Sequence, residues 1–399
     1  METILFVGAG RHQRRAIARV RELGLHVVAV DRSPVAEADI AEAVDFTDMD
    51  AVVEVGRRHD VAGVLTVASE RAVPVVAAVA ERLGLASIGT DVAYRMTNKR
   101  AMRQAFADAG VPQPRFAPVS DLGDARDALA EIGTPAVLKP ADSSGQRGLS
   151  RVDSEADLDA ALDAALDASP TGEALLEELM AGVERNTMLV VRRGEPHLLT
   201  VSDRLRPPGA GFGVALAHVY PSSLDDDSLA MAERVAADSV RALGLGDGIA
   251  YPQLIVDADG RIAVVEVAAR IPGGQMGDLV RIATGVDLVE VAVRQALGED
   301  VLGILARPRL AQPLAIRFLT AEPGPLPTGV VARVGGLDTV LAAPGVVQAE
   351  TYLQPGETVR PARVDGDRRG YVIAVADNPA EALARADAAA ALLEVEVEP

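Results

Sequence analysis

The first hundred residues alternate short apolar runs with amphipathic stretches. Residues 3–7 form an apolar run that ends in a glycine turn, which is typical of a buried strand. Residues 11–24 predict a helix, because apolar side chains recur on one face and Gly24 ends the pattern. A second apolar run follows at residues 26–31. The alternation continues to about residue 95 and predicts a small, parallel, doubly wound α/β unit.

Further along the chain the pattern changes to hairpins and longer helices. Apolar segments flank Arg193-Gly194 and also Asp259-Gly260, so each dipeptide is expected to form a hairpin turn. Residues 155–168 place leucines on one helical face and aspartates on the other, which predicts a helix with a solvated acidic side. From about Ala311 short strands and a last helix predict a compact tail.

Composition narrows the functional classes. The 399 residues are 49% apolar, carry a formal net charge of −19 and include no cysteine. Such a negative field repels polyanions, which argues against nucleic acids and anionic membranes as main ligands. Without cysteine, disulfides, thiolate nucleophiles and Cys-ligated metals are excluded. No apolar run approaches the ~20 residues of a membrane helix. No basic segment precedes the first apolar run, so we expect a cytoplasmic protein without a signal peptide.

The first glycine turn is half of a dinucleotide-binding fingerprint. Gly8 and Gly10 follow the first strand, and Asp31 ends the second. Gln13, however, stands where a third small residue would let helix and strand pack closely. A turn without a dinucleotide is therefore the favoured interpretation. An NAD-dependent dehydrogenase built on residues 1–95 is the less favoured one.

A second glycine-rich segment has the composition of a phosphate-binding loop. In "VLKPADSSGQRGLSRV", Lys139 ends an apolar strand and could reach phosphate oxygens. Residues 143–148 could present backbone N–H groups and hydroxyls to the same phosphates, and Arg147 adds charge. An ordinary Gly/Ser hairpin is the alternative.

Two acidic strand ends are also candidates for chemistry. In "LLEELMAGVE", backbone groups near Met180 could contact an adenine edge and Glu184 could accept from ribose hydroxyls; a plain acidic strand end is the alternative. In "VVEVAARIPGGQ", Glu266 is costly in an apolar strand unless it is paired or binds a metal. A carboxylate suits Mg²⁺, and Arg270 could bind a substrate carboxylate. The alternative is a buried Glu266–Arg270 salt bridge.

In this order, Lys99, "VLKP" with its loop, "LLEELMAGVE" and "VVEVAARIPGG" resemble the ATP-grasp superfamily. Within it the chain is similar to carboxylate–amine ligases of the L-amino acid ligase type, and more distantly to biotin carboxylase. The resemblance implies a mixed α/β and α+β chain. Its expected parts are an N-terminal Rossmann-like parallel α/β unit at 1–95, a two-subdomain ATP-grasp fold at 96–305 with a lid at about 117–180, and a small C-terminal α+β domain at 306–399.

The resemblance also implies a role for each matching residue. The expected nucleotide contacts are Lys99 and Lys139 on the phosphates, Ser144, Gly145, Gln146 and Arg147 in the lid loop, Glu177, Glu178 and the Met180 backbone at the adenine, and Glu184 at the ribose. The expected reaction centre comprises Glu266 on Mg²⁺, Arg270 on the carboxylate and acyl phosphate, the Gly273 and Gly274 backbone, and Arg317 near the substrate.

Two positions depart from the family pattern. The first metal-binding glutamate is replaced by Gln253, and the asparagine two residues after the second is replaced by Ala268. An amide carbonyl can ligate Mg²⁺ but brings no charge. The site is therefore expected to bind fewer ions or to bind them more weakly, to recruit a carboxylate such as Asp203, or to bind nucleotide without catalysis.

The resemblance implies an ADP-forming ligase that uses ATP and Mg²⁺, with Mn²⁺ as a substitute. It would join a carboxylate, such as an amino acid or small acid, to an amine through an acyl phosphate. The alternatives are a bicarbonate-using carboxylase of the same fold and a non-catalytic ATP-binding regulatory protein. The expected partners are small molecules, and a homodimer is one expected assembly. His218 and Arg206 flank a glycine-rich loop and are further candidates for substrate contacts; the favoured alternative is that both are ordinary surface residues.

Overall fold

The architecture comes from a computed structural model, which describes residues 1–33, 35–206 and 213–398. The N-terminal unit is a four-stranded sheet in the order β3-β2-β1-β4, and all its pairs are parallel, as the sequence predicted. Its strands are β1 (Thr3–Val7), β2 (His26–Asp31), β3 (Ile40–Ala43) and β4 (Gly63–Leu65), and its helices are α1 (Arg14–Glu22), α2 (Met49–Arg58) and α3 (Val73–Leu83).

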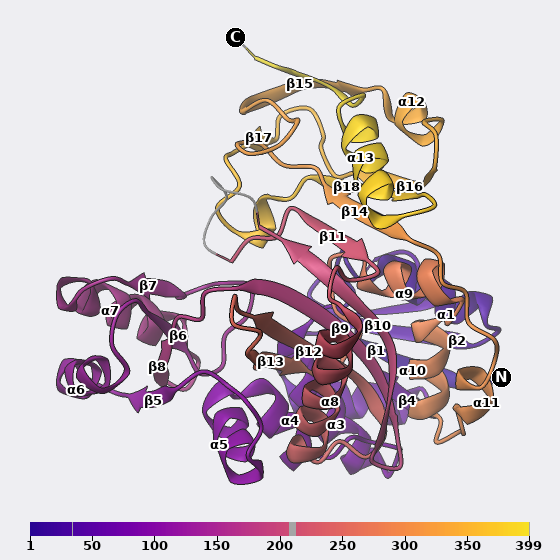
Figure 1. Ribbon diagram of the computed structural model, residues 1–399. Coiled ribbons are helices and arrows are strands. Elements are labelled where there is room, and N and C mark those ends of the chain that lie inside the picture. Colours follow the sequence, from indigo (N-terminus) through magenta and orange to yellow (C-terminus); the bar gives the residue numbers. More distant parts are fainter. Residues whose placement is uncertain (34, 207–212, 399) are drawn as a thin grey trace.

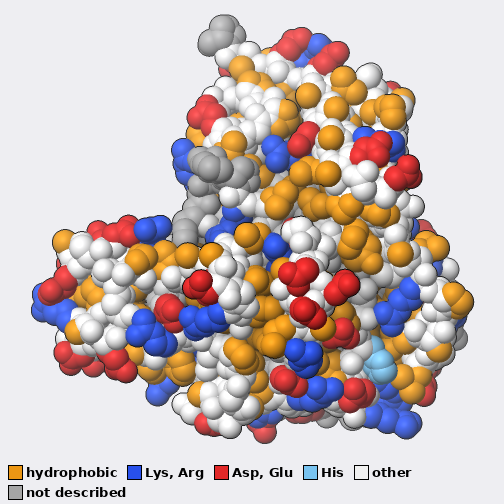
Figure 2. Space-filling view, in the orientation of Figure 1, with side chains coloured by type: hydrophobic (Ala, Val, Ile, Leu, Met, Phe, Trp, Pro, Cys, Tyr) orange, Lys and Arg blue, Asp and Glu red, His pale blue; other side chains and the backbone are white. Residues whose placement is uncertain are grey.

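Two helices, α4 (Thr90–Thr97) and α5 (Lys99–Ala109), lead from this unit to the lid, which projects from the body as an arm (Figure 1). The lid is an antiparallel sheet in the order β5-β8-β6-β7, covered by two helices. Its elements are β5 (Phe116–Val119), α6 (Leu122–Ile132), β6 (Ala136–Pro140), β7 (Ser150–Val152), α7 (Leu158–Ala168) and β8 (Ala174–Glu178). The outer surface of the arm carries acidic and basic side chains (Figure 2).

The body is built on one eight-stranded sheet in the order β13-β12-β9-β10-β11-β14-β18-β16. Its central part comprises β9 (Val183–Arg192), β10 (Glu195–Leu205), β11 (Ala217–Tyr220), α8 (Asp226–Leu243), β12 (Gly248–Val256), β13 (Ile262–Ala268), α9 (Met276–Thr284), α10 (Leu288–Ala296) and α11 (Leu302–Leu305). The tail comprises β14 (Leu314–Phe318), β15 (Gly329–Gly335), α12 (Leu337–Leu341), β16 (Val346–Thr351), β17 (Thr358–Val359), β18 (Gly370–Val375), α13 (Pro379–Ala390) and β19 (Glu394–Val397).

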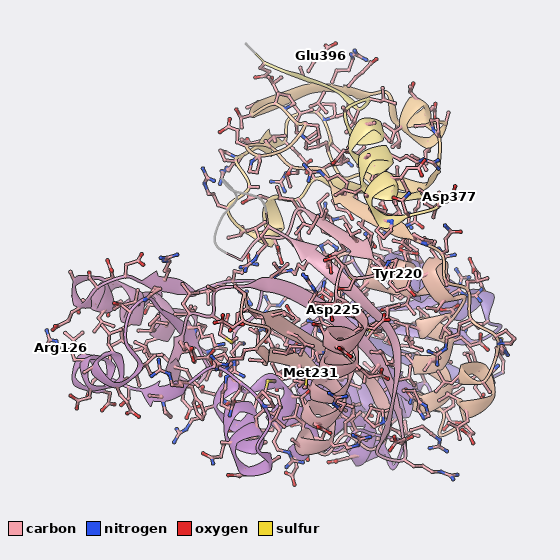
Figure 3. The ribbon with its side chains drawn as sticks, viewed as in Figure 1. Arg126, Tyr220, Asp225, Met231, Asp377 and Glu396 are labelled. Carbon is pink, nitrogen blue, oxygen red and sulfur yellow. The ribbon has the colours of Figure 1, made fainter. Side chains whose placement is uncertain are left out.

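The eight-stranded sheet continues across the domain boundary that was expected between residues 305 and 306. β14 pairs with β11, and β18 and β16 extend the same sheet, while β17, β15 and β19 form a separate small one. In Figure 3 Arg126 lies at the far end of the lid, and Glu396 lies in the tail beyond α13. The lid therefore stands away from the tail, and both are joined to the central strands.

Local sequence explains how these strands connect. Both expected hairpin turns are confirmed, between β9 and β10 and between β12 and β13. Gly194 and Gly260 adopt positive φ values of 77° and 79°, which glycine tolerates without strain, and Arg193 before Gly194 has a φ of 53°. One buried core joins Phe6 of the N-terminal unit to Val190 of the central sheet. No helix among the described residues is both long and apolar enough to cross a membrane.

Candidate active site

A cavity of about 550 Å³ lies where the lid, the central sheet and the Gly273-Gly274 turn meet. Every residue assigned a nucleotide contact lines it, as do Glu266, Gln253, Arg270, Gly273 and Gly274. Asp203, the alternative carboxylate for the metal, does not line it and lies 3.1 Å from Arg185 instead. The structure thus brings together residues that lie far apart in the sequence. Their individual roles remain predictions.

Arg317 does not belong to this group. Its Nε lies 3.1 Å from the Asp387 carboxylate of α13, and it does not line the cavity. Successive side chains of a strand point to opposite faces, and the neighbouring Phe318 takes the cavity side. The structure therefore does not bring Arg317 into the cavity with the other expected site residues.

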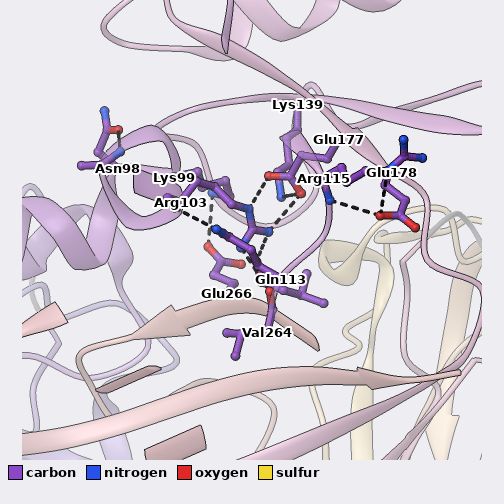
Figure 4. Close-up of polar contacts among 12 residues, drawn as sticks. Asn98, Lys99, Arg103, Gln113, Arg115, Lys139, Glu177, Glu178, Val264 and Glu266 are labelled. Atoms are coloured by element: carbon purple, nitrogen blue, oxygen red, sulfur yellow. Dashed lines mark hydrogen bonds and ion pairs between the residues drawn. The ribbon is translucent and has the colours of Figure 1, made fainter. Parts of the chain in front are cut away.

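Lys139 lies in a buried charge cluster at the base of the lid (Figure 4). Its Nζ is 2.7 Å from Glu177, and Arg103 holds the same carboxylate through two nitrogens at 2.8 and 3.0 Å. Burial lowers the pKa of Lys139 to about 8, and the Glu177 charge offsets only part of this effect. The Glu177 side chain thus supports the lysine, which leaves only its backbone for the expected adenine contact.

Replacing Arg103 by methionine is expected to destabilise the protein by about 3 kcal/mol, because removing one partner of a buried ion pair leaves charge uncompensated. Arg103 also donates to the carbonyls of Val264 and Val265, so it ties the lid to β13. Urea unfolding measures the change. Arg100→Met is the matched control, since its half-exposed guanidinium pairs with Glu173 and should contribute under 1 kcal/mol. Equal losses in the two variants would contradict the prediction.

The second expected phosphate-binding lysine, Lys99, lines the same cavity. Lys99 Nζ donates to the Ser143 carbonyl at 2.7 Å and lies 3.2 Å from Glu266. Lys99 and Lys139 are the only lysines in the chain, since 37 of its 39 basic residues are arginines. An ammonium is a compact point charge, whereas a guanidinium favours planar, bidentate partners. The positions of the two lysines in the sequence are therefore enough to indicate residues of this cavity.

The structure places Glu266 and Gln253, the two residues expected to hold the implied Mg²⁺, side by side in the cavity. They are direct cross-strand partners on β13 and β12, and both line the cavity. Burial would raise the pKa of Glu266, but Lys99 and Lys139 outweigh it and hold that pKa below its usual range. Among the described residues, no group of three or more acidic or histidine side chains is arranged to hold a metal ion. The two ligands fit an ion held mainly by nucleotide phosphates, as Mg²⁺ often is.

The glycine-rich lid loop is preformed in a tight conformation. Gly145, Gln146 and Gly148 have φ values of 68°, 65° and 70°. A β-carbon on Gly148 would lie 2.6 Å from that of Ala168, so only glycine fits there. The Gln146 amide donates to the Gly213 carbonyl at 2.8 Å, which anchors the loop to the body.

The expected adenine and ribose contacts also line the cavity. Glu178 pairs with Arg261 at 3.0 Å, so its carboxylate is engaged in an ion pair. The Met180 backbone has no hydrogen-bond partner among the residues that the structure describes. Glu184 is held by Arg204 and, at 3.1 Å, by Arg206. Backbone atoms of Met180 are therefore available for an adenine edge, and Glu184 is fixed in place by two arginines.

Arg270 is paired with a residue that sequence reasoning missed. Glu70 Oε2 accepts from Nε and Nη2 of Arg270 at 2.8 and 2.7 Å. The pair is buried, and burial raises the pKa of Glu70. Glu70 follows β4, so an acidic residue just beyond the carboxyl end of a parallel strand was the available signal.

The Gly8-Gly10 turn of the N-terminal unit is surrounded by hydrogen bonds made by side chains of the same unit. The Ala9 N–H donates to Asp31 at 2.8 Å, and Gln13 donates to the Val67 carbonyl at 2.9 Å. The carboxylate that a dinucleotide ribose would need is thus already engaged. This geometry agrees with the interpretation of Gly8 and Gly10 as turn residues.

Comparisons with known proteins agree with this geometry. Residues 97–303, more than half of the chain, match the family described as carbamoyl-phosphate synthase L chain, ATP binding domain. Residues 317–398 match L-amino acid ligase C-terminal domain 2.

Relatives and solved structures extend the likeness to the whole chain. An uncharacterized protein, y4rH, of Sinorhizobium fredii is 29% identical over 95% of this chain and 79% of its own length. The formate-dependent phosphoribosylglycinamide formyltransferase of Ignicoccus hospitalis is 28% identical over 98% of this chain and 95% of its own. The crystal structure of an L-amino acid ligase from Bacillus licheniformis superposes with a TM-score of 0.86 at 20% identity, covering 100% of this chain and 99% of that one. The chain therefore belongs to the ATP-grasp ligases, as the motifs predicted.

Proposed function

We propose that the protein is an ADP-forming carboxylate–amine ligase whose acid substrate is an α-amino acid. One observation carries the choice of acid. Nη1 of Arg270 and Oε1 of Glu70 are buried and have no hydrogen-bond partner within the described chain. A guanidinium N–H suits a carboxylate, and a carboxylate oxygen suits an ammonium group. An α-amino acid carries both groups on one carbon, so a single molecule would satisfy both atoms.

The nucleotide would occupy the lid side of the cavity. Lys99 and Lys139 would bind its phosphates, and residues 144–147 would close over them. Glu266 and Gln253 would hold Mg²⁺, which supplies positive charge that neutralises the phosphate oxygens during transfer. Little covalent chemistry would remain for the protein itself. Catalysis would be largely positioning of the reactants and electrostatic stabilisation by the lysines and the lid loop.

The reaction would proceed in two displacements. A carboxylate oxygen held by Arg270 attacks the γ-phosphorus, and the bond from that phosphorus to ADP breaks. The resulting acyl phosphate lies against the Gly273-Gly274 turn, where Gly274 has a φ of 67°. An amine then attacks the acyl carbon, and phosphate leaves with the electrons of the broken C–O bond.

A second cavity offers the amine a separate approach. Its volume is about 580 Å³, and it shares Arg11, Gly273, Gly274 and Tyr352 with the first. It lies between α1, α9 and the tail. Because the two cavities meet at the glycine turn, an amine can reach the acyl carbon without passing the nucleotide.

The test is phosphate release from ATP and Mg²⁺ with a panel of amino acids, small carboxylic acids, amines and bicarbonate. If the protein is this ligase, phosphate release should require an α-amino acid and should be stimulated by an amine. Release with bicarbonate alone would instead identify a carboxylase. ATP binding without turnover across the panel would favour a nucleotide-binding regulatory protein, for which the uncharged Gln253 is the supporting observation.

Glu70→Gln is expected to raise the KM for the amino acid roughly 10- to 100-fold, since it removes a charge-assisted hydrogen bond to the ammonium group, worth ~1.5–3 kcal/mol. The KM for ATP should change much less, because Glu70 pairs with Arg270 and makes no hydrogen bond to the expected nucleotide contacts. Steady-state kinetics with each substrate varied measures both. Glu54→Gln, at an exposed position of α2, is the control. A rise in the KM for ATP of the same size would refute the assignment.

A further inference from the structure

His218 lies on β11 with one ring edge at the reaction centre. The residue is 3% exposed, and its ring packs edge-on against Phe318 with centroids 5.4 Å apart. A β-carbon placed on Gly274 would lie 3.5 Å from Nε2 of His218, so this nitrogen faces the glycine turn. His218 lines the cavity that contains the expected nucleotide contacts, and among the described residues Nε2 has no hydrogen-bond partner. Nε2 is therefore available to a substrate bound beside the turn.

The surroundings keep this ring neutral. Burial, then Arg368 and Arg204, hold the pKa of His218 well below its usual value. Arg204 is its direct partner on β10 and pairs with Glu184 of β9. Arg368 lies 2.6 Å from Asp365 in the tail. An imidazolium would face two guanidinium groups, so His218 is a poor proton acceptor at neutral pH.

A buried amide determines which ring nitrogen carries the proton. Asn186 on β9 is completely buried, and its Nδ2 lies 3.0 Å from Nδ1 of His218. An amide nitrogen can only donate, so Nδ1 accepts and the proton of the neutral ring stays on Nε2. The atom that faces the glycine turn is then a hydrogen-bond donor.

We propose that neutral His218 donates its Nε2–H to the acyl oxygen of the bound acid, and that Asn186 is the positioning residue that fixes this tautomer. The inference rests on the proposed ligase function. When the amine nitrogen bonds to the acyl carbon, the carbonyl π electrons move to this oxygen, where Nε2–H stabilises the negative charge. Collapse of the adduct breaks the C–O bond to phosphate, and the proton lost by the nitrogen leaves with the phosphate. A neutral histidine is suited to this electrophilic role.

The tautomer can be measured without any turnover. In the full-length protein with ¹⁵N-labelled histidine, long-range ¹H–¹⁵N spectra distinguish Nε2–H from Nδ1–H rings, and His218→Gln identifies the signal. The expected result is an Nε2–H ring from pH 5.5 to 8. Asn186→Asp should move the proton to Nδ1, because a carboxylate only accepts. An Nδ1–H ring in the unmodified protein, or an imidazolium at pH 6.5, would overturn the proposal.

Kinetics then tests the donor itself. His218→Ala is expected to lower kcat by roughly 10²- to 10³-fold, the usual loss for one oxyanion donor, with the KM for ATP unchanged. His218→Gln should recover part of the loss because its amide can donate, and His197→Gln on β10 is the control. Equal losses in the Ala and Gln variants would overturn the donor role. Absence of turnover in the unmodified protein would instead refute the ligase function, while the tautomer result would still stand.

Discussion

Lys139→Ala is expected to lower kcat for ATP-dependent phosphate release by at least about 10²-fold. Lys139 would place a positive charge on the transferring phosphoryl group, and electrostatic contacts of this kind supply most of the catalysis in phosphoryl transfer. The substitution also removes one ion-pair partner of Glu177, whose carboxylate stays buried and paired with Arg103. Phosphate release at saturating ATP measures the effect. Lys139→Arg is the informative companion, since a planar guanidinium is a poor substitute for a point charge and should also be slow.

Activity should also depend on the ionisation of this lysine. Because burial lowers the pKa of Lys139 to about 8, the free protein loses the charge as pH rises through that value. ATP binding should therefore weaken above about pH 8.

The chain has only two lysines, so amine-directed acetylation followed by mass spectrometry can test directly whether ATP covers them. ATP should protect both, and labelling that ATP leaves unchanged would contradict the assignment.

The candidate site was predictable where residue type and its immediate neighbours determine the chemistry. Lys139 after an apolar strand, the Ser/Gly loop and Glu266 inside an apolar strand each stand out in the local sequence, and all line one cavity. The parallel N-terminal unit and both hairpins were likewise predictable from periodicity and turn residues. These features depend on sequence separations of a few residues.

The rest depends on contacts between distant segments. Glu70 meets Arg270 across 200 residues of sequence, and Arg103 meets Glu177 across 74. No local pattern encodes such pairs, so Glu177 was assigned to the adenine although its side chain holds Lys139. Arg317 lies outside the cavity for a different reason, since the sequence alone does not say which side chains of a strand face the cavity; that depends on how the sheet packs. The continuity of β14 with β11 was likewise not predictable from composition.

Glu266→Gln is expected to lower kcat by at least about 10³-fold and to raise the Mg²⁺ concentration needed for half-maximal activity. Gln253 is already uncharged, so this variant would leave the proposed ion without any carboxylate ligand from the described residues. Lys99 would also lose its partner, which lies 3.2 Å away. Magnesium titration of phosphate release measures both quantities, and chelation of the metal should abolish release in the unmodified protein.

Adding a carboxylate, instead of removing one, distinguishes a site that binds Mg²⁺ weakly and still catalyses from one that has lost catalysis. Gln253→Glu would restore a carboxylate directly opposite Glu266 across the β12–β13 pair. If catalysis works with a weakly held ion, this variant should lower the Mg²⁺ requirement by roughly tenfold, since hard cations prefer charged oxygen ligands. Gln253→Ala should raise the requirement only modestly. If the chain only binds nucleotide, Gln253→Glu should tighten ATP–Mg²⁺ binding while phosphate release stays absent in every variant.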